Sequence, residues 1–348
     1  MRVGVLTGGG DCPGLNAVIR AVTKSLLSQS GAEVIGIEDG FLGLAERRTR
    51  SLDWRSVSGI TGWGGTVLGT TNRFDPLASP ASTQAALDHA RALRLDALVA
   101  IGGDGTMTIA HALSQRGLPC VGVPKTIDND IAGSERSFGF DTAVATITEA
   151  LDRVQTTAQS HGRVMIVETM GRNAGWLALE AGIAGAADVV LLPEIDHDLD
   201  LVVQRCRERE QRQRFTVVCV AEGAKPRGGA QTHAPRSAAR PEPVRLGGVA
   251  HVLREQLQAH LSTEVRATVL GHVQRGGAPN AFDRVLATLY GNAAAALVRE
   301  QRFNQMVALQ DGQLAQVPLD AVAGRTRSVP PDHPLLRCAE QIGICLGR

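Results

Sequence analysis

The sequence predicts an α/β protein with mainly parallel sheets. Short apolar segments rich in β-branched residues alternate with longer amphipathic segments, which is the pattern of strands joined by helices. The apolar segments are nearly continuous, as in parallel strands that are covered on both faces. With 348 residues, of which 43% are hydrophobic, the chain is long enough for two domains or one large domain.

Six apolar segments are predicted to be buried strands, because each is short and rich in Val, Ile or Leu. Glycine-rich or charged residues follow several of them, and these junctions hold the candidate site residues. The predicted strands are residues 2–6, 96–101, 120–123, 164–167, 188–192 and 215–220.

The segments between the strands differ in character. Residues 15–27 carry apolar side chains along one face, which predicts an amphipathic helix. Residues 204–214 are rich in charge and predict a helix with a solvated surface. Residues 225–248 are rich in Pro, Gly, Ala and Arg and predict a long surface loop, whose arginines are also candidates for contact with an anionic ligand.

The composition excludes several classes of protein. Thirty-six basic and 35 acidic residues leave a formal charge of +1, and aromatic residues make up only 3%, so we expect no nucleic-acid partner. No apolar run reaches membrane-spanning length, and the N-terminus is unlike a signal peptide. The cysteines are scattered, which is typical of a reducing compartment. We therefore expect a cytoplasmic protein with no membrane partner.

Two glycine-rich turns follow predicted strands. Gly8, Gly9, Gly10 and Gly14 precede a helix predicted to start near Asn16, and the N–H groups of such a helix favour a phosphate. A glycine-rich turn can also be purely structural.

In the second turn, "GGDGT", Gly103 and Gly105 flank Asp104, and Thr106 follows. Asp104 would reach a phosphate only through Mg²⁺, because both groups are anionic. The alternative is that Asp104 merely caps a helix.

A third junction, "VGVPKTIDND", places Lys125, Thr126, Asp128 and Asp130 after a strand. Two carboxylates two residues apart raise each other's pKa unless a cation lies between them. With a metal ion on one of them, the other is available as a base. A simple turn with local side-chain caps is the alternative. All three junctions are expected at the edge where α/β sheets bind ligands, which together predicts phosphoryl transfer.

Further strand-like runs are followed by polar and charged residues that suit an anionic substrate, because a guanidinium binds phosphate with two hydrogen bonds. Each arginine alone is more often a surface ion pair. The candidates are Arg163, Arg172, Glu222, Arg266, His272 and Arg275.

The motifs "GGDCPGLNAVIR", "IGGDGT", "PKTIDNDI", "MGRNAGW" and "LGHVQRGG" occur in the order and approximate spacing of the 6-phosphofructokinase family. The chain resembles this family from Gly8 to about Arg284. "GGDGT" is shared with other kinases, whereas "TIDND" with "MGR" and "GHVQRGG" is close to unique to the family.

The resemblance implies two similar Rossmann-like lobes with the active site in the cleft between them. The lobe that binds the phosphoryl donor would comprise residues 1–139 and about 274–309. The lobe that binds fructose 6-phosphate would comprise residues 140–273 and about 310–348. The resemblance also implies a homo-oligomer, a dimer or tetramer, with shared active sites.

The resemblance further implies a role for each matched residue. Asp128 matches the general base, and Asp104 and Asp130 match aspartates linked to Mg²⁺. Thr126 and Arg172 match groups that stabilise the transferring phosphoryl group. Residues matched to the donor site are Gly10, Phe41, Arg73, Gly103, Asp104, Gly105, Thr106 and Lys125. Residues matched to the sugar-phosphate site are Thr126, Asp128, Arg163, Met170, Gly171, Arg172, Glu222, Arg266, His272 and Arg275, of which Arg163 and Arg266 reach a neighbouring subunit.

The sequence departs from the family's bacterial ATP-dependent members at several positions. Arg73 lies one place later than the corresponding arginine, after Asn72. Trp54 stands where allosteric members often carry an arginine that binds the effector, while Arg20 and Lys24 keep the basic character of that region.

Two residues bear on whether the phosphoryl donor is ATP or pyrophosphate. Gly105 leaves room for the α-phosphate of ATP, which a carboxylate there would repel. Lys125 matches pyrophosphate-dependent members. Because a blocking group decides more than an added attraction, we expect ATP, with pyrophosphate as the alternative. Two other classes of protein fit the sequence less well. A non-catalytic sensor is expected to lose the aspartates, and an NAD-dependent oxidoreductase would need a ribose-binding pattern that is absent.

Overall fold

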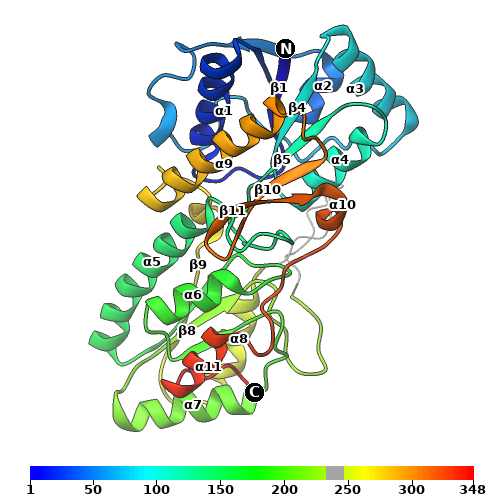
Figure 1. Ribbon diagram of the computed structural model, residues 1–348. Coiled ribbons are helices and arrows are strands. Elements are labelled where there is room, and N and C mark those ends of the chain that lie inside the picture. The colour runs from blue at the N-terminus through cyan, green and yellow to red at the C-terminus, as the bar shows by residue number, and fades with distance from the viewer. Residues whose placement is uncertain (233–246) are drawn as a thin grey trace. The chain divides into compact units, whose positions relative to one another are not determined.

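The computed structural model describes residues 1–232 and 247–348 and divides the chain into two compact units. The first unit contains Met1–Thr142 and Arg275–Arg327, and the second contains Ala143–Gln274 and Ser328–Arg348. Each unit is an α/β structure with its own sheet (Figure 1). The α/β prediction is therefore confirmed.

One predicted boundary was wrong. Residues 310–327 were expected in the lobe of the second unit, but they belong to the first. The reason is β11 (Gln313–Pro318), which pairs antiparallel with β10 (Gln305–Gln310) in the first unit's sheet. Asp311 and Gly312 join the two strands with positive φ angles of 50° and 71°, as a two-residue hairpin turn requires.

The sheet of the first unit has seven strands in the order β11-β10-β5-β4-β1-β2-β3. The pairs between β10, β5, β4, β1 and β2 are parallel, and the edge strands β3 and β11 pair antiparallel. The remaining strands of this sheet are β1 (Arg2–Thr7), β2 (Glu33–Ile37), β3 (Thr49–Leu52), β4 (Ala97–Gly102) and β5 (Cys120–Pro124).

Helices cover both faces of this sheet, which explains the continuous apolar strands. On one face, side chains such as Leu98 and Cys120 pack against α2 (Phe41–Glu46), α3 (Pro80–Ala92), α4 (Asp104–Ser114) and α10 (Leu319–Val322). The helices α1 (Leu15–Ser30) and α9 (Ala281–Arg299) pack against each other, and they contact strands β2 and β5 (Figure 1). All six residues of β4 are buried, and truncating such a side chain costs about 2–5 kcal/mol.

The second unit holds a parallel sheet of four strands in the order β7-β8-β6-β9. One face packs against α7 (Leu199–Arg212) and α8 (Val249–Gln258), through residues such as Val203 and Leu253. The strands are β6 (Val164–Thr169), β7 (Val189–Leu191), β8 (Thr216–Ala221) and β9 (Val265–Val269), and the other helices are α5 (Phe140–His161, whose first three residues belong to the first unit), α6 (Trp176–Ala184) and α11 (Pro334–Gln341).

Most of the predicted elements are confirmed. All six predicted strands are present, and residues 15–27 and most of 204–214 are helical. Of the predicted loop at 225–248, residues 233–246 lie outside the described residues. Among the helices that the structure describes, none combines the length and hydropathy that a membrane span requires.

Candidate functional site

The register of the first unit's sheet brings the three predicted junctions to one edge. Thr7 pairs with Ile101, and Gly102 pairs with Pro124, so β1, β4 and β5 end side by side. The residues that follow these strands therefore lie together at their carboxyl ends, where ligands bind to α/β sheets.

The glycine-rich turn after β1 is closely packed against this edge. Gly8 donates its N–H to the carbonyl of Ile101 at 2.8 Å, and a side chain on Gly8 would come within 2.5 Å of Thr106 Oγ1. Gly9 and Gly14 have φ angles of 75° and 108°, a region that favours glycine. The turn leads into α1, whose N-cap residue, Gly14, makes no side-chain cap and accepts the N–H groups of Ala17 and Val18 through its carbonyl. The dipole at this helix N-terminus favours an anion.

Lys125 and Arg275 hold this turn from the other side. The Nζ of Lys125, a side chain that is only 3% exposed, donates to the carbonyl of Gly10. Burial lowers the pKa of Lys125. Arg275 donates to the carbonyl of Asp11 at 3.3 Å, and its guanidinium lies 3.0 Å from where a side chain on Gly10 would begin. Both cations thus lie beside the glycine turn.

Asp104 is the first residue of α4, and the residue at the cap position is Gly103. The alternative prediction, that Asp104 is the cap, was therefore wrong. Its Oδ1 accepts a hydrogen bond from the N–H of Gly324 at 3.1 Å. Gly105 follows in the first turn of the helix, and a Cβ added there would meet nothing within 4 Å. The space in front of Gly105 is open, as the sequence predicted.

Asp128 lies in a tight loop after β5. Its Oδ1 is buried and has no hydrogen-bond partner among the described residues. Burial, together with the negative charge of Asp130, raises the pKa of Asp128 to about 6, although Arg275 and Lys125 act in the opposite direction. A buried, unpartnered carboxylate oxygen is costly, and such atoms often mark a functional site.

The carboxylates of this loop repel one another. Burial raises the pKa of Asp130, a hydrogen bond from the Thr126 side chain lowers it, and the charge of Asp104 raises it further. Thr126 Oγ1 also accepts a hydrogen bond from the N–H of Asp128 at 3.0 Å. This bond forms the simple turn with a side-chain cap that was the alternative prediction for this junction. The turn and the pair of interacting carboxylates therefore coexist in one loop.

Two predicted donor-site residues lie in different surroundings. Phe41 is 5% exposed and belongs to the apolar core of the first unit, so most of its ring is covered. Arg73 is exposed, while the side-chain oxygen of Asn72 lies 4.0 Å from the Cβ position of Gly9. Near the effector region, Lys24 Nζ lies 5.0 Å from the ring centre of Trp54, which is 51% exposed.

The second unit repeats the arrangement at its own sheet edge. Thr169 pairs with Ala221 and Glu168 with Val269, so β6, β8 and β9 end together. The residues that follow are Met170, Gly171, Arg172, Glu222, Gly223 and His272. The sequence predicted all of these except Gly223.

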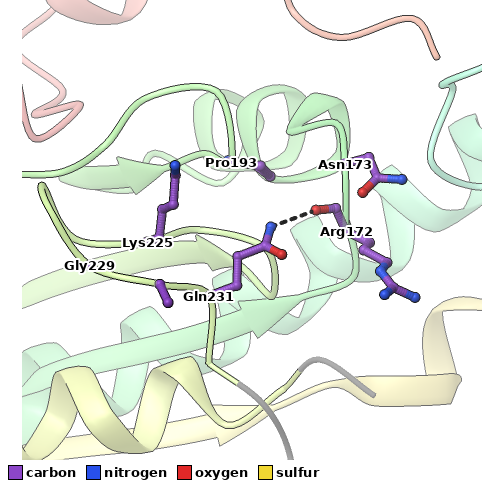
Figure 2. A pocket seen from close by; sticks show the side chains of 7 residues that line it. Arg172, Asn173, Pro193, Lys225, Gly229 and Gln231 are labelled. Atoms are coloured by element: carbon purple, nitrogen blue, oxygen red, sulfur yellow. Dashed lines mark hydrogen bonds between the residues drawn. The ribbon is translucent and has the colours of Figure 1, made fainter. Parts of the chain in front are cut away.

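Gly223 is required by close packing between two loops. A side chain on Gly223 would lie 2.1 Å from the carbonyl oxygen of Arg172. Gln231 fastens the same loops, because its Nε2 donates to the carbonyl of Arg172 at 3.3 Å (Figure 2) and to the carbonyl of Gly223 at 3.0 Å. Sequence reasoning missed Gln231, which belongs to the segment that was predicted to be a loop.

A pocket of about 440 Å³ lies beside this contact. Figure 2 shows the side chains of Lys225, Asn173 and Pro193 around it, with the exposed Arg172 at its margin. Lys225 is paired with Asp196 at 3.2 Å. The lining of the pocket includes polar side chains, and the Arg172 guanidinium points away from Gln231 and Lys225 (Figure 2).

Arg163 and Arg266 share one carboxylate. Both guanidinium groups pair with Glu264, and the side chain of Arg266 is 58% exposed. Partial desolvation raises the pKa of Glu264, but the two arginines outweigh it and leave the pKa below its usual value. The structure thus holds the exposed Arg266 and the half-buried Arg163 together on one carboxylate.

Several proteins of known sequence are similar to this chain. Residues 2–298 match the family described as Phosphofructokinase. The chain is 46% identical over 356 residues to ATP-dependent 6-phosphofructokinase 2 of Clostridium perfringens, which covers 99% of this chain and 97% of that protein. It is also 46% identical over 348 residues to pyrophosphate–fructose 6-phosphate 1-phosphotransferase of Streptomyces coelicolor, which covers all of both chains.

Solved structures are similar too. The structure of phosphofructokinase from Saccharomyces cerevisiae matches with a TM-score of 0.79 and 32% sequence identity. The match covers 92% of this chain and 45% of that chain.

Proposed function

The chain belongs to the phosphofructokinase family, and we propose that it transfers a phosphoryl group from ATP to the 1-hydroxyl of fructose 6-phosphate. One observation carries the proposal. Asp128 has a buried, unpartnered Oδ1 and a raised pKa, and it lies at the strand edge that also carries Asp104, Asp130 and the glycine turns. This combination suits a base that works next to bound phosphates.

Asp128 would accept the proton of the sugar hydroxyl as its oxygen attacks the phosphorus atom. A base is most effective when its pKa lies near the working pH, and a pKa of about 6 is closer to neutrality than that of an ordinary aspartate. Arg275 and Lys125 lower the pKa of Asp128, which favours its ionised form. Thr126 keeps the loop in place through the N–H of Asp128. Its single hydroxyl proton, which Asp130 accepts in this structure, would turn to the phosphoryl oxygens when the donor binds.

Asp104 and Asp130 fit a magnesium ion. Among the described residues, no group of three or more His, Cys, Asp or Glu side chains forms a complete metal site. Mg²⁺ does not require one, because it commonly uses one or two carboxylates together with phosphate oxygens and water. The mutual repulsion of Asp104 and Asp130 is what a bound cation would relieve. When bound, Mg²⁺ would neutralise negative charge on the donor phosphates.

ATP is supported as the donor by Gly105. The open space in front of Gly105 leaves a path for a nucleotide beyond its terminal phosphates. The glycine turn of Gly8–Gly10, Gly103 and the buried Thr106 would line the phosphate path. Relatives named as ATP-dependent are 44–48% identical to this chain, and a relative named for pyrophosphate is 46% identical, so the names favour ATP while the site itself is used to argue the donor.

Pyrophosphate is the second candidate, and Lys125 is the observation that favours it. Its ammonium group lies beside the glycine turn, where it would attract a compact, highly charged donor. The carbonyl of Gly10 already binds this ammonium group, however. We therefore place Lys125 as a group that shapes the turn for either donor and retain ATP as the proposal.

The second unit is proposed to bind the sugar phosphate. Arg172 would stabilise the transferring phosphoryl group, and Arg275 of the first unit would contact the sugar phosphate. Planar guanidinium groups at such positions suit phosphate. The remaining proposed contacts of the sugar phosphate are Met170, Gly171, Glu222 and His272.

We propose that the enzyme works as a dimer or tetramer in the cytoplasm. The exposed Arg266 and the half-buried Arg163 would bind the phosphate of the sugar held by a neighbouring subunit. Glu264 would then serve to orient the two guanidinium groups. The six cysteines, all within the described residues, are free, which fits a reducing compartment.

The test is to incubate the purified protein with fructose 6-phosphate, Mg²⁺ and ATP and to follow the product. We expect fructose 1,6-bisphosphate, identified by cleavage with aldolase, and no product when a chelator removes the metal. Asp128→Asn is the matched control, because it keeps the size of the side chain and removes the base. If wild-type protein gives no bisphosphate with either ATP or pyrophosphate, the proposed function is wrong.

A further inference from the structure

We propose that residues Gly324–Arg327, which we term the strap, position the two carboxylates assigned to the metal ion, and that Arg327 is the main positioning residue. This inference rests on the proposed function, in which Asp104 and Asp130 hold Mg²⁺. The strap follows α10 and ends the first unit (Figure 1). It lies more than 190 residues along the chain from the nearer of the two carboxylates.

At one end, the strap fixes Asp104. The N–H of Gly324 is shared between Asp104 Oδ1 and Thr108 Oγ1, both at 3.1 Å. Thr108 in turn donates its hydroxyl to the backbone carbonyl of Asp104 at 3.1 Å. Gly324 has a φ of 68°, a conformation that favours glycine and aims its N–H at the carboxylate. Oδ1 is thereby oriented, while Oδ2 receives no hydrogen bond from the described residues.

At the other end, the strap fixes the loop that carries Asp130. Thr326 forms an isolated antiparallel bridge with Ile131. The backbone N–H of Arg327 donates to the carbonyl of Asp130 at 2.7 Å, and its guanidinium donates to the carbonyl of Asn129 at 3.0 Å. The strap therefore contacts three consecutive residues of the loop.

Asn129 shows why the loop needs this support. Its φ is 53°, a left-handed conformation that non-glycine residues seldom adopt. Its side chain is committed to Ser137 and Glu135, at 2.9 and 3.0 Å. Arg327 binds the carbonyl of this left-handed residue, so it stabilises the peptide between Asp128 and Asp130.

The two carboxylates repel each other, so an unsupported pair would move apart in the absence of a cation. Hydrogen bonds from the strap oppose this movement and hold the pair ready for a metal ion. Residues that orient metal ligands typically change metal affinity by about 10–100-fold when they are mutated. Because Arg327 binds through a backbone carbonyl, we expect an effect of about 10-fold, at the lower end of that range.

The experiment compares Arg327→Met and Arg327→Lys with wild type and with Arg325→Met. Arg325 is exposed in the same strap, so its substitution is a matched control. Two quantities are measured: binding of Mn²⁺ alone, by electron paramagnetic resonance, and the Mg²⁺ concentration that gives half-maximal activity. Thermal unfolding checks that each variant folds.

We expect Arg327→Met to weaken Mn²⁺ binding about 10-fold and to raise the Mg²⁺ requirement similarly, with the KM for fructose 6-phosphate changed less than about twofold. Arg327→Lys, which keeps the charge, should recover part of the loss, and Arg325→Met should behave as wild type. If Arg327→Met fails to fold, Arg327→Lys still tests the inference, because wild-type Mn²⁺ affinity in that variant would overturn it.

Asp130→Asn separates this inference from the proposed function. If Asp130→Asn loses Mn²⁺ binding and Arg327→Met does not, the metal pair stands and the role of the strap is wrong. If Asp130→Asn binds Mn²⁺ and requires Mg²⁺ as wild type does, the assignment of the metal pair itself fails. If wild type binds no Mn²⁺ in the absence of a phosphate donor, the Mg²⁺ concentration for half-maximal activity decides between these outcomes in the same way.

Discussion

Replacing Gly105 with aspartate should convert the donor site from one that admits ATP to one that excludes it. Gly105 is the second residue of α4, its φ is not in the left-handed region, and a Cβ there meets nothing within 4 Å. An acidic residue in the first turn of a helix is also favourable to the helix dipole. The substitution should therefore leave folding intact, and its effect should fall on the ligand.

The size of the effect follows from electrostatics. A carboxylate on this open side would lie about 4–5 Å from an α-phosphate, and with an effective dielectric constant of about 20 the repulsion is about 3–4 kcal/mol. That energy corresponds to a loss of about 10²–10³-fold in kcat/KM for ATP. Pyrophosphate does not extend to this position, so its binding should change much less.

The assay is steady-state kinetics with ATP and with pyrophosphate for three variants. Gly105→Ala should retain ATP activity, because the space is open, and Gly105→Asn should lie between alanine and aspartate, because it has the size without the charge. Equal kcat/KM for ATP in Gly105→Asp and wild type would refute the reasoning. Equal losses in Gly105→Ala and Gly105→Asp would show that packing, and not charge, is responsible.

Three further substitutions test the other assignments. Asp128→Asn should lower kcat by about 10²–10⁴-fold with KM changed only a few-fold, and near wild-type turnover would reject Asp128 as the base. Inactive Arg266→Ala and inactive Asp128→Asn subunits, when mixed and reassembled, should regain some activity through hybrid sites, whereas inactive hybrids of well-folded parents would contradict shared sites. Gly223→Ala should force the loop of Arg172 to move, lowering the midpoint of thermal unfolding and costing about 1–3 kcal/mol; an unchanged midpoint and KM for fructose 6-phosphate would oppose this.

The central strands could be predicted because their chemistry is local. A parallel strand covered on both faces is apolar throughout, so segments such as β4 and β8 are visible in the sequence. The edge strand β3 was missed for the opposite reason. β3 contains the sequence TRSL, of which only Leu52 is buried, and a strand of this kind has no apolar pattern.

The sequence does contain a signal for the hairpin of β10 and β11, and this hairpin was not predicted. Asp311-Gly312 between two short extended runs is a strong indicator of a two-residue turn. The boundary at about residue 309, which the family resemblance implied, therefore left out residues 310–327 of the first unit.

In the candidate site, too, residues within local sequence motifs could be predicted, whereas residues that contact the site from far along the chain could not. The aspartates and glycines stand in recognisable motifs, so their place at the sheet edge was predicted from the sequence. The residues that support these aspartates and glycines do not stand in recognisable motifs. Arg327 reaches the loop of Asn129 from 198 residues away, and Gln231 reaches Arg172 from 59 residues away. Such pairs are created by the fold, and no spacing rule in a single sequence reveals them.

The most direct test of the account is the ratio of kcat/KM for ATP to kcat/KM for pyrophosphate, measured side by side with the wild-type protein, fructose 6-phosphate and saturating Mg²⁺. The account predicts phosphorylation of fructose 6-phosphate with ATP clearly preferred, because the space at Gly105 is open and Lys125 is bound to the carbonyl of Gly10. Activity with pyrophosphate and none with ATP would contradict the proposed donor, and no activity with either would contradict the proposed function.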